Sequence, residues 1–135
     1  MKKDNLEKSK KVKKVKKIPS GRGCLYVHSS FNNLIITITK ENGDKLEQIS
    51  SRTATGYRGS KGATFLAAEK ASEVALTRLT EFGISSVKIV FCGIGIGRDA
   101  AYKKFRSATG LLKEGLFDKT PLAFNGCRPR KTPRK

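Results

Sequence analysis

Residues 34–50 read LIITITKENGDKLEQIS and carry the clearest structural pattern in the chain. Over 34–39, Leu34, Ile36 and Ile38 alternate with Ile35, Thr37 and Thr39, the period of a β-strand with one buried face. The dipeptide Asn42-Gly43 predicts a type I′ hairpin turn, with positive φ at both residues. A strand over 45–50 should follow. A first strand over 24–29, turning at Asn32-Asn33, completes three consecutive strands.

Downstream of these strands the pattern changes. Residues 52–62 show no apolar period and contain three glycines, so we expect an irregular connection there. Thr64 is suited to cap a helix running to about Phe82, with Gly83 just beyond its end. The buried stripe of this helix should be Ala68, Ala71, Ala75, Leu79 and Phe82. The short apolar run 87–92 predicts an internal strand, broken by the glycines of 93–97.

A second helix should open at Asp99 and end near Gly110. Its predicted buried stripe is Ala101, Phe105, Ala108 and Leu112. A short strand is expected over 115–118. The element order is then βββαβα followed by this short strand. It predicts a single α/β domain with one mixed sheet and two main helices packed against it. We assign this domain to residues 21–120, between a Lys-rich arm over 1–20, expected to be disordered, and a basic extended tail over 121–135.

The net charge of +18 points to a polyanionic partner. The arm over 1–20 holds nine lysines and two acids, and the tail over 121–135 holds five basic residues and no acid. Lys outnumbers Arg by 20 to 9, which favours contacts to a phosphate backbone over base readout. An anionic membrane surface is the alternative, but Val12, Val15 and Ile18 are too few to anchor the arm.

Several classes of protein are disfavoured. No apolar run reaches the roughly 18–20 residues of a membrane span, and the N-terminus lacks the apolar region of a secretory signal. Three widely spaced cysteines, Cys24, Cys92 and Cys127, argue against a disulfide framework and for a reducing compartment. With His28 they form no C-x-x-C pair, so we expect no zinc site and no activated nucleophile.

An enzyme is also disfavoured. The acids Asp44, Asp99 and Asp118 are explained by a turn, a helix start and a strand end, so a two-metal nuclease is not expected. In Gly93–Gly97 the third glycine comes one residue too early for a dinucleotide fingerprint. We therefore expect no catalytic residue, no cofactor, no metal and no small-molecule substrate.

Two segments of the body are candidate nucleic-acid contacts. Residues 52–62 place Arg52, Arg58 and Lys61 among glycines, with Tyr57 able to stack on a base of irregular RNA. The glycines of 93–97 precede a helix, where backbone N–H groups and the helix dipole favour phosphate. The alternative for residues 52–62 is a solvated connection, and the alternative for the glycines of 93–97 is a plain tight turn.

The tail and three upstream motifs closely resemble the family of bacterial-type ribosomal protein eleven of the small subunit. The tail contributes Asn125-Gly126-Cys127-Arg128-Pro129 and a basic end. Upstream, the same order and spacing are matched by His28–Asn33, Gly56–Lys61 and Gly93–Arg98. The resemblance covers about residues 20–135. The family usually has prolines where this chain has Ile94, Ile96 and Phe65, and a histidine where it has Phe124.

The resemblance implies a ribonuclease-H-like fold without its nuclease site. It implies binding to small-subunit ribosomal RNA on the platform, in the central and 3′ major regions, near the messenger exit, with small-subunit proteins seven and eighteen as neighbours. The ribosome would be bacterial or organellar. A free-standing nucleic-acid chaperone or nucleoid protein is the alternative function. The expected RNA contacts are Asn32, Asn33, Arg52, Tyr57, Arg58, Ser60, Lys61, Gly93, Gly95, Gly97, Arg98, Lys103, Asn125, Gly126, Arg128, Arg130, Lys131 and Arg134.

Overall fold

A computed structural model describes residues 21–134, so the Lys-rich arm predicted over 1–20 lies outside the described residues. The elements are β1 (Arg22–Ser29), β2 (Leu34–Lys40), β3 (Lys45–Ser50), α1 (Ser51–Thr55), a 3₁₀ turn η1 (Gly59–Ala63), α2 (Phe65–Glu81), β4 (Ser86–Cys92), α3 (Gly97–Ser107) and β5 (Leu112–Asp118). From Lys119 to Arg134 the chain forms no helix or strand. Within 21–134, no helix is both long enough and apolar enough to cross a membrane.

The strands form one mixed sheet in the order β3-β2-β1-β4-β5. β1 pairs antiparallel with β2, and β2 pairs antiparallel with β3. β4 lies parallel to β1, and β5 lies parallel to β4. The predicted three-strand start, the mixed pairing and the α/β class are therefore confirmed.

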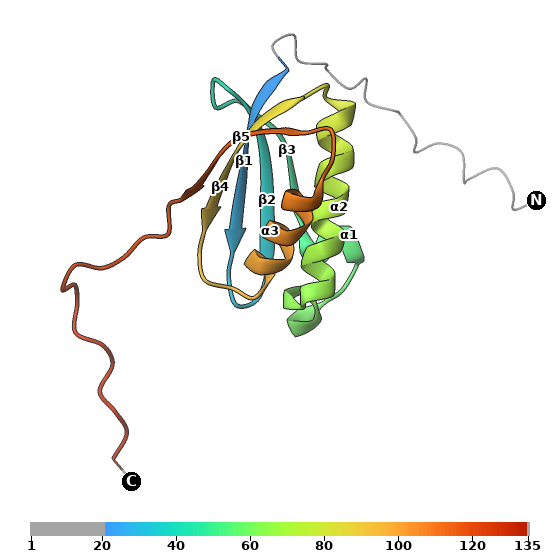
Figure 1. The fold of residues 1–135 in the computed structure, drawn as a ribbon. Helices are drawn as coiled ribbons and strands as arrows, with labels where there is room; N and C mark the ends of the chain where they lie inside the picture. Colours follow the sequence, from blue (N-terminus) through green and yellow to red (C-terminus); the bar gives the residue numbers. More distant parts are fainter. Residues whose placement is uncertain (1–20, 135) are drawn as a thin grey trace, which may run out of the picture.

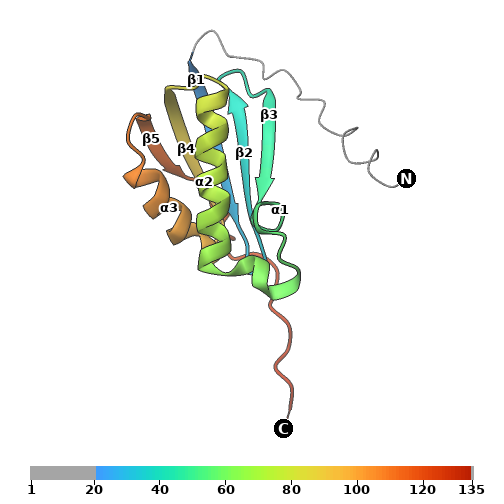
Figure 2. The same ribbon diagram turned by 90° about the vertical axis from the view of Figure 1, so that its right-hand side faces the viewer.

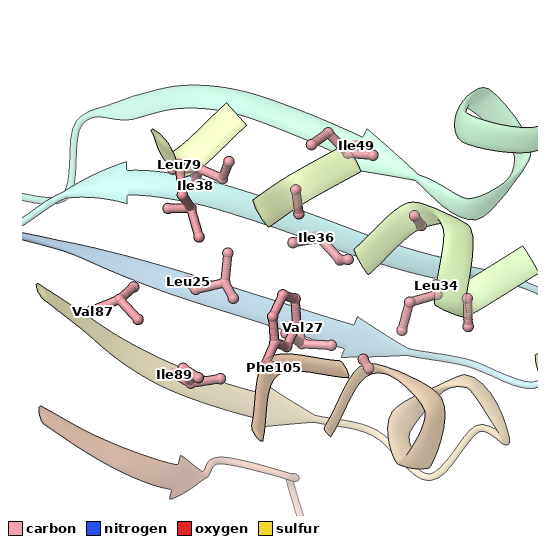
Figure 3. Close-up of a cluster of buried hydrophobic side chains, with 14 of the residues drawn as sticks. Leu25, Val27, Leu34, Ile36, Ile38, Ile49, Leu79, Val87, Ile89 and Phe105 are labelled. Carbon is pink, nitrogen blue, oxygen red and sulfur yellow. The ribbon is translucent and has the colours of Figure 1, made fainter. Parts of the chain in front are cut away.

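Helices α2 and α3 cover one face of this sheet, and the other face carries no helix within the described residues (Figures 1 and 2). The core lies between the two layers (Figure 3). Alternate residues of the strands face the helices, as the period-two pattern predicts. They include Leu25, Val27, Ile36, Ile38, Val87 and Ile89, which pack with Leu79 and Phe105 of the helices.

The first long helix follows its sequence signals closely. The Thr64 hydroxyl accepts a hydrogen bond from the backbone N–H of Ala67, and Gly83 has a φ of 74° just beyond the helix end. The predicted stripe is buried through Ala68, Ala71, Ala75 and Leu79, while Phe82 is partly buried against the core.

The hairpin between β2 and β3 differs from the predicted type I′ turn. Gly43 has a φ of 89°, but Asn125 is the one non-glycine residue within 21–134 with positive φ, so Asn42 does not adopt the predicted conformation. The Lys40 N–H donates to the Asp44 carbonyl and the Gly43 N–H donates to the Lys40 carbonyl. This is a three-residue loop closed by a left-handed glycine, which needs one positive φ instead of two.

The second long helix is shorter at its C-terminal end than its apolar pattern predicts. It begins at Gly97, two residues before Asp99, and ends at Ser107. Ala101 and Phe105 are buried as expected, but Ala108 is already extended. Leu112 was placed wrongly in the buried stripe, since it begins β5 and is 67% exposed. The apolar spacing continues past the end of the helix, because spacing alone does not show where the backbone leaves the helical conformation.

The connection over 52–62 contains two short helical segments that we did not expect. The Ser50 hydroxyl accepts a hydrogen bond from the Thr53 N–H and caps α1, and Gly56 ends it with a φ of 73°. The 3₁₀ turn η1 follows at Gly59–Ala63. Helices of five residues are too short to display an apolar period, so only their caps could have revealed them.

Candidate nucleic-acid interface

Five segments from three separate parts of the sequence meet at one end of the sheet. They are the β1–β2 turn over 30–33, the segment over 51–63, the start of α2, the glycine loop over 93–97 and the start of α3. Figure 1 shows the β1–β2 turn and the glycine loop side by side at this end. We call it the loop end. It brings together all the predicted contacts of the body.

Ser51 connects two of these segments. It is completely buried, and its hydroxyl lies 2.7 Å from Asn33 Oδ1 and 2.5 Å from the Gly62 carbonyl oxygen. The Leu34 N–H donates to the same hydroxyl over 3.3 Å. Arg52 reaches the Asn32 carbonyl oxygen at 3.5 Å, and its aliphatic part lies over Gly62. The β1–β2 turn and the segment over 51–63 therefore form one connected unit.

Gly93 and Gly95 are explained by packing inside the protein. A Cβ on Gly93 would lie 2.1 Å from the Ser29 carbonyl oxygen, and one on Gly95 would lie 2.2 Å from the Ser30 carbonyl oxygen. The Gly95 N–H donates to the Ser29 carbonyl, and the Gly93 N–H donates to Thr120 Oγ1. Because both N–H groups have partners, the structure does not support our expectation that they bind phosphate.

The loop end carries cations that have no acidic partner. Arg52, Arg58, Lys61, Lys70 and Lys103 are exposed and form no ion pair within residues 21–134. Ser60, between two of them in η1, is also exposed. Unpaired basic side chains keep their charge available for a polyanion.

Aromatic side chains lie beneath two of these lysines. Lys70 Nζ is 6.0 Å from the centre of the Tyr57 ring, and Lys103 Nζ is 5.6 Å from the centre of the Phe65 ring. At these distances and at exposed sites the ring faces attract the ammonium groups only weakly, by about 0.5–1 kcal/mol. Lys103, one of the expected RNA contacts, thus lies at the loop end from α3. Lys70 was not among the expected contacts, because a single lysine on a helix gives no signal in the sequence.

Apolar side chains also project at the loop end. Phe31, Ile94 and Ile96 are 71%, 69% and 67% exposed. They extend from the β1–β2 turn and from the glycine loop, which are joined by the hydrogen bond between Gly95 and Ser29. Exposed apolar groups of this size among cations offer contact area for sugars or bases.

Most acidic side chains lie away from the loop end. Asp44 belongs to the β2–β3 turn at the opposite end of the sheet and pairs with Lys40. Glu69 and Glu73 both contact Lys104, and their hydrogen bonds, that of Glu73 first, raise the pKa of this lysine. Asp99, exposed at the start of α3, is by contrast an acid that lies at the loop end itself. Five cations without an acidic partner therefore gather at the loop end, although Lys45, Arg106 and Lys113 elsewhere in residues 21–134 also have none.

Arg98 is the exception among the predicted cations, because it is held within the protein. Its Nη1 donates to the Gly93 carbonyl at 3.0 Å, and its Nη2 lies 2.6 Å from Asp118 Oδ2. Its guanidinium carbon is 5.6 Å from the centre of the Phe91 ring. The side chain is 29% exposed. Gly97, one residue earlier, packs closely against Ala68 and Leu34.

The predicted contacts of the tail lie apart from those of the body. Asn125, Gly126, Arg128, Arg130, Lys131 and Arg134 are all exposed. Within residues 21–134, no hydrogen bond of the tail beyond Thr120 joins it to the sheet or helices. The tail leaves the end of β5 beside the loop end and extends away from the body (Figures 1 and 2). Asn125 has a φ of 45°, which turns the chain within the motif.

No cluster of three potential metal ligands occurs within residues 21–134. Cys24 and Cys92 are half-buried and unpaired, and Cys127 is exposed in the tail. Cys24 pairs with Lys88, and His28 with Cys92, between neighbouring strands on the face without helices. At the loop end, the exposed charges, ring faces and apolar side chains described above are suited to binding.

Comparison with known proteins gives a consistent result. The model of the family described as Ribosomal protein S11 matches residues 23–134. A small ribosomal subunit protein uS11 of Nautilia profundicola is 42% identical over 131 residues, which cover 97% of each chain. The protein of the same name from Thermus thermophilus is 39% identical, over 96% of this chain and 98% of its own. That of Campylobacter curvus is 41% identical, over 88% and 91%.

Proposed function

Because the chain belongs to the ribosomal protein S11 family, whose members are structural, non-enzymatic constituents of the small ribosomal subunit, we propose that its loop end and tail bind small-subunit ribosomal RNA. The observation that carries this proposal is a group of five exposed cations at the loop end that have no acidic partner among residues 21–134. Their charge complements a phosphate backbone, and each contact to a phosphate would release a condensed counterion.

The body and the tail have different parts in this binding. At the loop end, Arg58 and Lys61 contact phosphates, while Tyr57 and the exposed Phe31 lie against unpaired bases or sugars. In the tail, Arg128, Arg130, Lys131 and Arg134 reach into RNA away from the body. Asn125 and Gly126 set the direction of the chain before these cations. Gly93, Gly95 and Gly97 shape the glycine loop and bring its neighbours to the RNA.

We propose the location in the subunit on the basis of the family resemblance. We place the protein on the platform, near the messenger exit, against the central and 3′ major regions of the RNA, with proteins seven and eighteen as neighbours. The curated relatives named above are bacterial, which favours a bacterial over an organellar ribosome. By domains, we propose a folded body over 21–120 that positions the basic tail over 121–135, with the arm over 1–20 adding charge.

Binding to small-subunit ribosomal RNA transcribed in vitro tests this function. We expect the affinity to fall steeply, by tenfold or more, between about 50 and 200 mM salt, because several phosphate contacts are made. An affinity that does not change over this range would overturn the proposal. Sedimentation distinguishes a subunit constituent from a free-standing chaperone. A subunit constituent comigrates with small subunits at moderate salt, whereas a chaperone stays in the unbound fraction.

A further inference from the structure

Arg98 lies at the centre of a hydrogen-bonded cluster that joins the glycine loop to the first residues of the tail. Besides the Gly93 carbonyl and Asp118, its Nη1 lies 3.3 Å from Thr120 Oγ1. Asp118 Oδ1 accepts from the Thr120 N–H at 2.9 Å and from its hydroxyl at 2.6 Å. We call Arg98, Asp118 and Thr120, with the main chain of Gly93, the tail clasp.

The backbone beside the clasp is fixed as well. The Gly93 N–H donates to Thr120 Oγ1 at 3.1 Å, and the Lys119 N–H donates to the Phe91 carbonyl at 2.8 Å. These bonds connect the end of β4 with the chain just beyond β5. Thr120 is the last residue that hydrogen bonds hold to the body within 21–134. The tail therefore leaves the body at this point.

The chemistry of Arg98 suits an internal role. Its planar guanidinium donates to several acceptors at once, a geometry that a lysine ammonium cannot reproduce. Its side chain is mostly buried over the Phe91 ring, unlike the exposed cations of the loop end. Its charge is already balanced by Asp118, whose pKa is lowered to about 2 by hydrogen bonds from Thr120 first and Arg98 second.

We propose that Arg98 is a positioning residue, which holds Asp118 and Thr120 so that the basic tail leaves the body in the direction needed to bind ribosomal RNA. This rests on the proposed function for the tail, but the clasp itself can be measured without RNA. A direct phosphate contact is the competing role for Arg98, and the two roles predict opposite results at Asp118.

The first experiment is amide hydrogen exchange of the full chain without RNA. In Arg98→Lys and Arg98→Ala, the amides of Gly93, Lys119 and Thr120 should exchange about tenfold faster or more, since hydrogen bonds to a charged group are lost. The amides of Ala71 and Ala75 in α2 should keep their exchange rates, which shows that the fold is intact. Unchanged exchange at all three clasp amides would overturn the clasp.

The second experiment measures the affinity of the same variants for small-subunit ribosomal RNA transcribed in vitro. Asp118→Asn removes a negative charge, so electrostatics alone would strengthen binding. The clasp predicts that Asp118→Asn weakens binding to the same degree as Arg98→Ala, and that Arg98→Lys does not restore it. Asp99→Asn is the matched control, because Asp99 is an exposed acid on the same helix as Arg98 and should bind as tightly as the parent or more tightly.

The outcomes keep the two proposals separate. Full affinity in Arg98→Lys together with tighter binding in Asp118→Asn would contradict the positioning role and assign Arg98 to a phosphate. If the parent protein itself fails to bind the RNA while the exchange results hold, the proposed function fails and the clasp stands as a structural feature only.

Discussion

At the scale of single residues, the loop end is held together by polar side chains whose role could not be recognised in the sequence. Ser51 follows a strand and resembles any serine in a turn, yet its buried hydroxyl connects Asn33, Leu34 and Gly62. Asn33 was predicted to contact RNA, but its side-chain oxygen is within hydrogen-bonding distance of Ser51 inside the protein. Residue type could be read from the sequence, whereas the partner of each polar group depended on which loops meet.

The hydrogen-bond partners of Arg98 could not be predicted from the sequence either. Its place after the glycine loop favoured a phosphate contact, because cations near helix starts often bind anions. The acceptors that hold it, Asp118 and Thr120, lie about twenty residues further along the chain. Only the parallel pairing of β4 with β5 brings them to Arg98, and this pairing is a property of the whole sheet.

The Asp118 carboxyl provides a residue-scale test of the clasp by pH. Its pKa in the folded protein is about 2, below the ordinary value of 3.8, because Thr120 and Arg98 stabilise the charged form. Because the pKa is lower in the folded than in the unfolded protein, the ionised carboxylate stabilises the fold. This stabilisation is fully present above pH 3.8 and is lost as the pH falls through about 2. A carboxyl NMR titration should find the Asp118 midpoint near 2, and higher in Arg98→Ala. A midpoint near 3.8 in the parent would contradict the clasp.

At the scale of elements, the strands and the first long helix were predictable because their signals are local and repeated. Alternation over 34–39, the Thr64 cap and Gly83 each act within a few residues, and each was found in place. The end of α3 was mispredicted because Ala108 and Leu112 continued an apolar spacing after the backbone had left the helix. Spacing predicts a buried face only while the helix lasts.

The glycine loop is the element whose sequence is most constrained by packing. In Gly95→Ala the new methyl group would meet the Ser30 carbonyl oxygen at 2.2 Å, so the β1–β2 turn and the loop would have to separate. We expect the free energy of unfolding to fall by about 1–3 kcal/mol or more, measured by denaturant titration. The matched change Gly126→Ala, whose methyl group would lie 3.4 Å from Ala123, should alter it by less than about 0.5 kcal/mol. Equal effects would refute this packing role.

At the scale of the whole molecule, charge is distributed with a direction. Within residues 21–134, five cations of the loop end have no acidic partner, whereas Arg22, Lys40 and Lys88, elsewhere on the sheet, each have one. The net charge of +18 predicted a polyanionic partner, but it did not indicate which end of the body faces that partner. That information came from the fold, which brings the β1–β2 turn, the segment over 51–63 and the starts of α2 and α3 together.

A comparison of two charge-matched triple variants tests the central claim most directly. One variant replaces Arg52, Arg58 and Lys61 of the loop end by alanine, and the other replaces Arg22, Lys40 and Lys45 of the opposite end. Both lose three positive charges, and affinity for small-subunit ribosomal RNA is measured across salt concentrations. We predict that the loop-end variant binds more weakly and that its slope of log affinity against log salt is shallower by about 2–3, while the opposite-end variant keeps the parent slope. Equal losses of affinity and slope in both variants would contradict the assignment of the loop end as the RNA-binding surface.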